Sequence, residues 1–258
     1  MPASSFTSLP TELICQVFQW SDDFSAVAAL AQTARVFYNS WRENPTPICR
    51  AVAPRVLSNI GAAERLLNVQ EEAEAESPAQ HEQGPKSIIR AKRLLANARC
   101  ASAASNRWVQ FCQIEHFRND SEGNLAPMRP HEIARFEHAF YCVWTIGTMA
   151  KAPHLQKQAS AFLDQASPAD LARLDELATW ASNYNDNDFE SVGLDLESEI
   201  WRAGYSLVSD RWSAWQASEE NKGPRIYMAS KYEGPIGFFA FFDHTQRWID
   251  MIEENGKK

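Results

Sequence analysis

Hydrophobic residues in the first 41 positions recur every three or four residues, which is the spacing of an amphipathic helix. Pro10 and Glu12 suit the first turn of a helix, where proline loses no hydrogen bond and a carboxylate meets the positive end of the dipole. The acidic break at Ser21, Asp22 and Asp23 supplies a capping side chain. The pattern therefore predicts three short helices, with apolar positions at Leu13, Ile14, Val17 and Phe18, then Phe24, Val27, Leu30 and Ala31, then Val36, Phe37 and Trp41.

Breaks in the pattern divide the next part of the chain. Residues 42–60 contain three prolines and are expected to form an irregular joint, with a short helix over 51–57. Helical spacing resumes over 61–76 and ends in an acidic, alanine-rich run. Residues 77–85 combine proline and glycine with no large apolar side chain, so we expect a flexible surface loop there. An acidic binding tail is the alternative interpretation of this segment.

Successive helical patterns follow from residue 86 to the C-terminus. Ser167, Pro168 and Asp170 are typical of a helix start with elements of a capping box. Aromatic and apolar residues then recur at steps of four and three, at Trp201, Tyr205, Val208, Trp212 and Trp215. Such a stripe occupies one helix face, and core packing between helices is its expected role; a ligand cage is the alternative.

The composition agrees with a helical fold. The 36 alanines outnumber valine, isoleucine and threonine together, which total 31. Alanine loses no side-chain entropy in a helix, whereas β-branched residues lose rotamers there. With 258 residues and 45% hydrophobic content, the chain is long and apolar enough for one or two folded domains. We therefore predict an all-α protein.

The charge distribution argues against two classes of partner. The net charge of −8 arises in residues 131–258, which carry 20 acidic and 12 basic residues, whereas residues 1–130 carry 13 of each. A chain without a basic face gains little from counterion release, so we expect no nucleic-acid partner. The longest uncharged stretch, residues 139–150, is too short for a membrane-spanning helix, and we expect no membrane partner.

The cysteines and the N-terminus point to a reducing compartment. The five cysteines are widely spaced and include no CxxC pair, which is typical of reduced core thiols. No basic segment precedes an apolar run at the N-terminus, so we expect no cleaved signal peptide. These features predict a soluble protein of the cytoplasm, the nucleus or both.

Motifs for catalysis and for metal binding are missing from the sequence. It contains no GxSxG, phosphate-loop, GxGxxG or HExxH motif, so we expect no enzyme activity and no cofactor. His131 and His138 share a helix face but lie about 10 Å apart, too far to bind one metal ion. The acidic pair Asp186 and Asp188 lies among asparagines and is expected in a solvated turn. An unfamiliar helical enzyme would need a pocket that gathers these groups.

The first block, SLPTELICQVFQWSDDFSAVAALAQTARVFYNSW, resembles the F-box, the adaptor-binding module of SCF-type ubiquitin ligases. The resemblance rests on Leu9-Pro10 with Glu12-Leu13, on Val17-Phe18, Asp22 and Leu30, and on Thr33, Arg35 and the closing Trp41. The continuation WRENPTPICRAVAPR and the late segment GPIGFFAFFDHTQRWIDMI look like those of fungal F-box proteins with an all-helical C-terminal region. Trp20 and Ser21 stand where the family usually has leucines, and Ala34 where it often has cysteine.

The resemblance implies a three-helix, F-box-like adaptor-binding domain at residues 5–50, packed on or linked to a larger irregular helical region. Residues 51–85 are expected to form a connecting helix and the loop, and residues 86–258 a helical region that binds a target protein. The implied function is substrate recognition within an SCF-type ubiquitin ligase. A Skp-family adaptor, and through it a cullin, are the implied partners; a helical scaffold that uses the segment outside a ligase is the alternative.

The residues themselves also indicate a partner for this block. A segment of about 35 residues with three short helices rarely builds a self-sufficient core. Part of its apolar set should therefore pack on residues 86–258 of the same chain or, as the resemblance favours, insert into a partner's groove. The expected adaptor-binding residues are Leu9, Pro10, Leu13, Ile14, Val17, Phe18, Val27, Leu30, Phe37 and Trp41.

Overall fold

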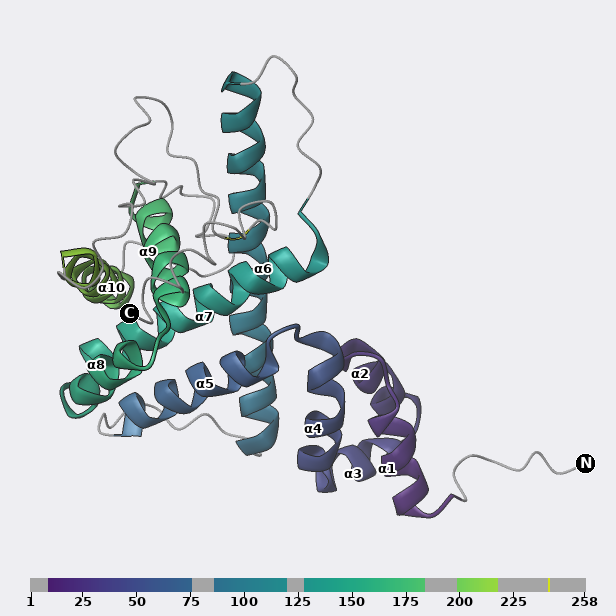
Figure 1. The fold of residues 1–258 in the computed structure, drawn as a ribbon. Helices are drawn as coiled ribbons and strands as arrows, with labels where there is room; N and C mark the ends of the chain where they lie inside the picture. The colour runs from purple at the N-terminus through teal and green to yellow at the C-terminus, as the bar shows by residue number, and fades with distance from the viewer. Residues whose placement is uncertain (1–8, 76–85, 120–127, 184–198, 218–240, 242–258) are drawn as a thin grey trace, which may run out of the picture. The chain divides into compact units, whose positions relative to one another are not determined.

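The computed structural model describes residues 9–75, 86–119, 128–183, 199–217 and Phe241. Every regular element in these residues is helical, so the all-α prediction is confirmed (Figure 1). The expected loop at 77–85, the acidic turn around Asp186 and Asp188, and the late segment quoted above lie outside the described residues, except for Phe241.

The chain divides into two compact units, residues 1–67 with 79–98 and residues 68–78 with 99–258. The first unit contains α1 (Thr11–Gln19), α2 (Phe24–Thr33), α3 (Arg35–Glu43) and α4 (Pro45–Val56). The second contains α7 (Pro130–Lys151), the 3-10 turn η2 (Pro153–Leu155), α8 (Gln156–Asp164), α9 (Pro168–Asn183) and α10 (Glu199–Ala217). Two helices have residues in both units, α5 (Ile60–Ala75) and α6 (Lys86–Asn119).

The first unit begins with the three helices that the sequence pattern predicts. Asp23 caps α2, because its side-chain oxygen accepts a hydrogen bond of 2.7 Å from the backbone N–H of Ala26. The helix α1 packs against α3 and α4, and α2 packs against α3. The core of this unit therefore lies between these packed helices, of which α2 begins at the capping residue that the sequence indicates.

The segment expected to be an irregular joint is instead the twelve-residue helix α4. Pro45 and Pro47 fall in its first turn, where backbone N–H groups lack an intrahelical acceptor in any case. Pro54 lies in the last turn, close to the end of the helix. The prediction of an irregular joint was wrong because Pro45 and Pro47 lie at positions where a helix tolerates proline, and Pro54 lies where the helix is about to end.

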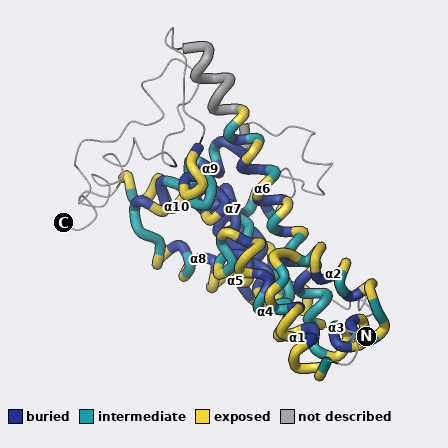
Figure 2. Tube along the Cα trace, turned by 90° about the vertical axis from the view of Figure 1, so that its right-hand side faces the viewer, coloured by how far each residue is buried: buried dark blue, intermediate teal, exposed yellow. Residues whose placement is uncertain are grey.

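The second unit is built around α7, which packs against α8, α9 and α10. Most of its residues from Phe136 to Met149 are buried, so a large part of the helix appears dark blue in Figure 2. The predicted cap of α9 is confirmed, since Ser167 Oγ accepts a hydrogen bond of 3.1 Å from the backbone N–H of Asp170. The stripe on α10 is partly core: Trp201, Tyr205 and Val208 are buried.

A carboxylate, Asp175 on α9, is half-buried beside Ser209 of α10, and its raised pKa predicts that the stability of the second unit depends on pH. Burial raises its pKa above the ordinary value, and a hydrogen bond of 2.8 Å donated by Ser209 Oγ partly opposes the shift. Because the folded-state pKa lies above that of the unfolded chain, stability falls as pH rises from about 4 through the folded-state pKa. At neutral pH the half-buried negative charge of Asp175 therefore lowers the stability of the second unit.

Asp175→Asn is therefore expected to raise the Tm at neutral pH, because asparagine keeps an acceptor for Ser209 and carries no charge. At about pH 3, roughly one unit below the unfolded-state pKa of about 3.9, the aspartate is mostly protonated in both states, so the gain should shrink toward zero. Thermal unfolding at the two pH values measures the difference. A gain that is equal at both would contradict this explanation.

Candidate protein-interaction surface

The candidate site begins with α1, whose ends are fixed by the backbone. The carbonyl of Pro10 accepts hydrogen bonds from the N–H groups of Leu13 and Ile14, at 3.0 and 3.1 Å. At the other end, the N–H of Trp20 donates to the carbonyl of Gln16 at 3.0 Å. Glu12 lies in the first turn, as expected from the sequence. The backbone hydrogen bonds at both ends of α1 therefore fix the directions in which its side chains point.

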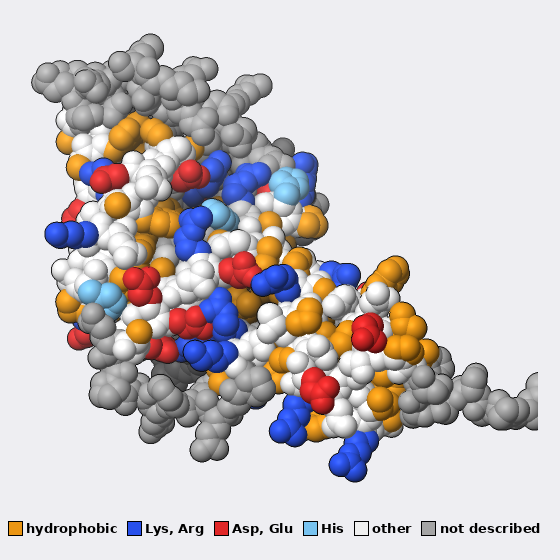
Figure 3. All heavy atoms as spheres, turned by 90° about the horizontal axis from the view of Figure 1, so that it is seen from below, with side chains coloured by type: hydrophobic (Ala, Val, Ile, Leu, Met, Phe, Trp, Pro, Cys, Tyr) orange, Lys and Arg blue, Asp and Glu red, His pale blue; other side chains and the backbone are white. Residues whose placement is uncertain are grey.

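Three large apolar side chains of α1 and its C-cap are exposed to solvent. The exposed fractions are 44% for Leu13, 45% for Val17 and 81% for Trp20. At about 100° per residue, these three positions fall within an arc of about 60° on the helix. We call Leu13, Val17 and Trp20 the α1 stripe. Figure 3 shows hydrophobic side chains, in orange, at the surface of the part of the molecule on the right.

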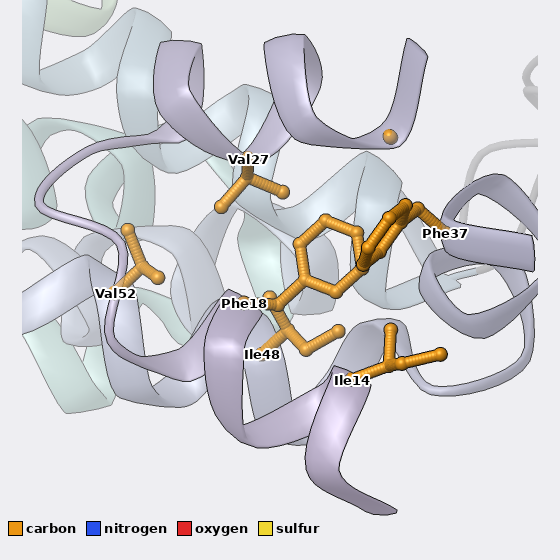
Figure 4. Packing of buried hydrophobic residues seen from close by; sticks show 7 residues of the cluster. Ile14, Phe18, Val27, Phe37, Ile48 and Val52 are labelled. Carbon is orange, nitrogen blue, oxygen red and sulfur yellow. The ribbon is translucent and has the colours of Figure 1, made fainter. Parts of the chain in front are cut away.

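The adjoining face of α1 carries the core of the first unit. Ile14 and Phe18 are 0% exposed and belong to one buried cluster with Val27, Phe37, Ile48 and Val52 and with Ala31 (Figure 4). The ring centroid of Phe18 lies 6.2 Å from that of Phe37 in an edge-on arrangement. The apolar arc of α1 thus has two roles, since one part closes the unit's own core and the other faces solvent.

The ten predicted adaptor-binding residues separate into three groups by burial. Pro10, Leu13 and Val17 are exposed. Leu9, Leu30 and Trp41 are half-buried and pack against the core cluster. Four are buried, namely Ile14, Phe18, Val27 and Phe37, because neighbouring helices cover them, and we therefore leave them out of the candidate surface.

Trp20 is the residue that the predicted set missed. The sequence marks it only as a position where the F-box pattern usually has leucine. Its helix position was a usable signal, because residues 13, 17 and 20 follow steps of four and three along one face. Extending the stripe from Leu13 and Val17 by one further step reaches Trp20.

The turn after α1 is tied to α4 by Arg55. Its Nη1 atom donates to the carbonyl oxygens of Gln19 and Ser21, at 2.5 and 3.1 Å. Residues 16–19, the last turn of α1, include no basic side chain, so Arg55 supplies the positive charge that suits a helix C-terminus. The guanidinium thereby links the helix that carries the stripe to the helix that completes the core.

The cysteines of the first unit are poor nucleophiles. Burial raises the pKa of Cys15, and the carboxylates of Glu12 and Glu43 raise it further. Burial also raises the pKa of Cys49, to about 11. A thiol with a raised pKa stays protonated at neutral pH and reacts slowly. These groups therefore suit packing and not covalent chemistry.

The histidines considered as ligands do not form a metal centre. His131 and His138 are both exposed on α7, and His138 Nε2 lies 3.6 Å from the sulfur of Cys142. Within the described part of the chain, no group of three or more histidine, cysteine or acidic side chains could hold a metal ion. The α1 stripe is the candidate functional site.

No protein-family model, curated protein or solved structure matches the chain. None of the described helices combines the length and the apolar character that crossing a membrane requires. The interpretation of the α1 stripe therefore rests on the residues, their packing and the F-box resemblance of the sequence.

Proposed function

We propose that the chain is the non-catalytic substrate-recognition subunit of an SCF-type ubiquitin ligase and that the α1 stripe docks on a Skp-family adaptor. One observation carries the proposal: Leu13 and Val17, both within the F-box-like pattern, expose apolar surface beside a core that other residues complete. An amphipathic helix with exposed apolar residues four positions apart is the form that fits a partner's hydrophobic groove.

The α1 stripe alone is too small for a stable interface, so the adaptor must contact more of the first unit. A stable interface buries about 800 Å² on each partner, more than three side chains provide. Pro10 is exposed and Leu9 half-exposed at the start of α1, so they extend the stripe along the chain. We therefore assign Leu9, Pro10 and the α1 stripe to the adaptor contact, which must also cover further surface of the first unit.

The proposed role is to bring a target close to the ligase machinery. The adaptor and cullin would hold a conjugating enzyme near a target bound by the helical region of residues 86–258. Holding both on one assembly raises the effective concentration of a target lysine at the enzyme. None of the four described cysteines is joined in a disulfide, which supports a role in the cytoplasm or nucleus.

The double substitution Leu13→Asp with Val17→Asp is expected to weaken adaptor binding at least 100-fold. Each removes an apolar contact of about 1.5–3 kcal/mol if fully buried in the complex, and each places a carboxylate in the interface. Both positions are exposed in the chain itself, so folding should persist. Co-purification and titration calorimetry with a purified Skp-family adaptor measure the loss.

The matched control is Ser25→Asp with Thr46→Asp, which adds the same charge to exposed first-turn positions of α2 and α4. The positive end of the helix dipole interacts favourably with a carboxylate at these positions, so this variant should fold and bind normally. Normal adaptor binding by the stripe variant would overturn the proposal. Adaptor binding without recovery of a cullin in the complex would favour a scaffold outside a ligase.

A further inference from the structure

The C-terminal end of α1 presents the most exposed of the large hydrophobic side chains described. Trp20 is 81% exposed, although a tryptophan in a folded protein is usually well buried. It has two side-chain torsions, so its capture by a partner costs little conformational entropy for the large area that it covers. Tryptophan is also enriched among the few residues that dominate binding energy in protein interfaces.

The backbone around Trp20 is held on both sides. Its own N–H lies 3.0 Å from the carbonyl of Gln16, and the N–H of Ser21 donates to the carbonyl of Phe18 at 3.1 Å. The Arg55 guanidinium then holds the carbonyls of Gln19 and Ser21, the residues immediately before and after Trp20. Because the backbones of Gln19, Trp20 and Ser21 are all hydrogen-bonded, the Cα atom that carries the indole is held in place.

We propose that Trp20 is the anchor of the adaptor contact and that Arg55 is a positioning residue that presents it. This inference rests on the proposed function, since the adaptor is the partner that it concerns. The adaptor must then offer an apolar pocket wide enough for an indole, next to the groove that accepts Leu13 and Val17. Presenting the indole in advance lowers the ordering cost of binding.

The positioning role can be tested without the adaptor. The full chain labelled with 5-fluorotryptophan gives ¹⁹F resonances, and the Trp20 signal is assigned as the one lost in Trp20→Phe. Arg55→Met should shift and sharpen this signal as the turn gains freedom, while leaving the Trp41 signal unchanged. Arg50→Met is the matched control, because Arg50 is exposed on the same helix. An unchanged Trp20 signal in Arg55→Met would overturn the positioning role.

The anchoring role is tested by a double-mutant cycle in adaptor binding. We expect Trp20→Ala to weaken binding at least 30-fold, as for an interface hot spot. Arg55→Met should weaken it about fivefold in the wild-type background and less than twofold in the Trp20→Ala background, because its effect passes through the indole. Arg55→Lys should recover part of the loss.

The outcomes separate this inference from the proposed function. If the chain binds the adaptor and Arg55→Met weakens binding equally in the wild-type and Trp20→Ala backgrounds, the proposed function stands and the inference is overturned. Weakening of less than threefold by Trp20→Ala overturns the anchor in the same way. A wild-type chain that does not bind the adaptor at all overturns both, and the fluorine spectra then still report whether Arg55 fixes the turn.

Discussion

Gly147→Ala is expected to destabilise the second unit by about 3 kcal/mol, at the upper end of the range for overpacked cores. A Cβ atom at Gly147 would lie 2.1 Å from the backbone carbonyl oxygen of Ile200, inside the contact distance of any two heavy atoms. Gly204 faces the same crossing, where its Cβ would lie 2.8 Å from the carbonyl oxygen of Val143. The two glycines let α7 and α10 approach backbone to backbone.

The clash cannot be relieved by a side-chain rotation, because the opposing atom belongs to the backbone of α10. Moving α10 away would separate the rings of Phe140 and Trp201, whose centroids lie 4.7 Å apart. The substitution therefore costs packing as well as strain. Urea unfolding followed by far-ultraviolet circular dichroism measures the loss of stability.

Gly61→Ala is the matched control for this experiment. No other described atom lies within 4 Å of a Cβ built at Gly61, apart from those of its own helix and chain neighbours. Alanine is favoured over glycine inside a helix, so this variant should gain about 0.4–1 kcal/mol. Opposite signs at Gly147 and Gly61 are expected, and a loss below about 1 kcal/mol at Gly147 would show that α10 adjusts freely.

The starts of two helices, α2 and α9, could be predicted from the sequence because local signals set them. The acidic residue Asp23 caps α2, and Ser167 caps α9, each through a hydrogen bond within three residues along the chain. These contacts need no tertiary partner, so their spacing in the sequence is sufficient evidence. The same holds for the helical fold class, which follows from alanine content and helical periodicity.

The role of each apolar position on α1 could not be predicted in the same way. Leu13 and Ile14 are neighbours of similar hydrophobicity, yet one is 44% exposed and the other 0%. Which of them faces the core depends on where α3 and α4 lie, and this is a tertiary property. The helix α4 was itself expected to be shorter, so the partner that covers Ile14 and Phe18 was missing from the prediction.

The aromatic stripe on α10 contains residues that are buried, as predicted, and residues that are only half-buried. Trp201 and Tyr205 are buried and in ring contact, as core packing predicts. Trp212 and Trp215 are only half-buried and stack on each other with centroids 5.0 Å apart. The period therefore identifies a face of the helix, while the depth of burial along that face depends on what the rest of the chain places against it.

Phe18→Ala is expected to cost the first unit about 3–5 kcal/mol, as for a buried phenylalanine whose removal leaves a cavity. Phe18 is 0% exposed, and its ring lies 6.2 Å from Phe37 and 6.3 Å from Trp41, centroid to centroid. Folded domains have about 5–15 kcal/mol of stability in total, so this loss is a large share. Amide hydrogen exchange of residues 11–56 measures it region by region.

The variant Val17→Ala distinguishes a loss of folding stability from a loss of contact with the adaptor. Val17 is the sequence neighbour of Phe18 but 45% exposed, so its truncation should change stability by no more than about 0.5 kcal/mol. Both variants should bind the adaptor more weakly, Phe18→Ala because a larger fraction of the unit is unfolded and Val17→Ala because a contact is lost while hydrogen exchange is preserved. Preserved hydrogen exchange in Phe18→Ala would contradict its place in the core and would return its side chain to the docking surface.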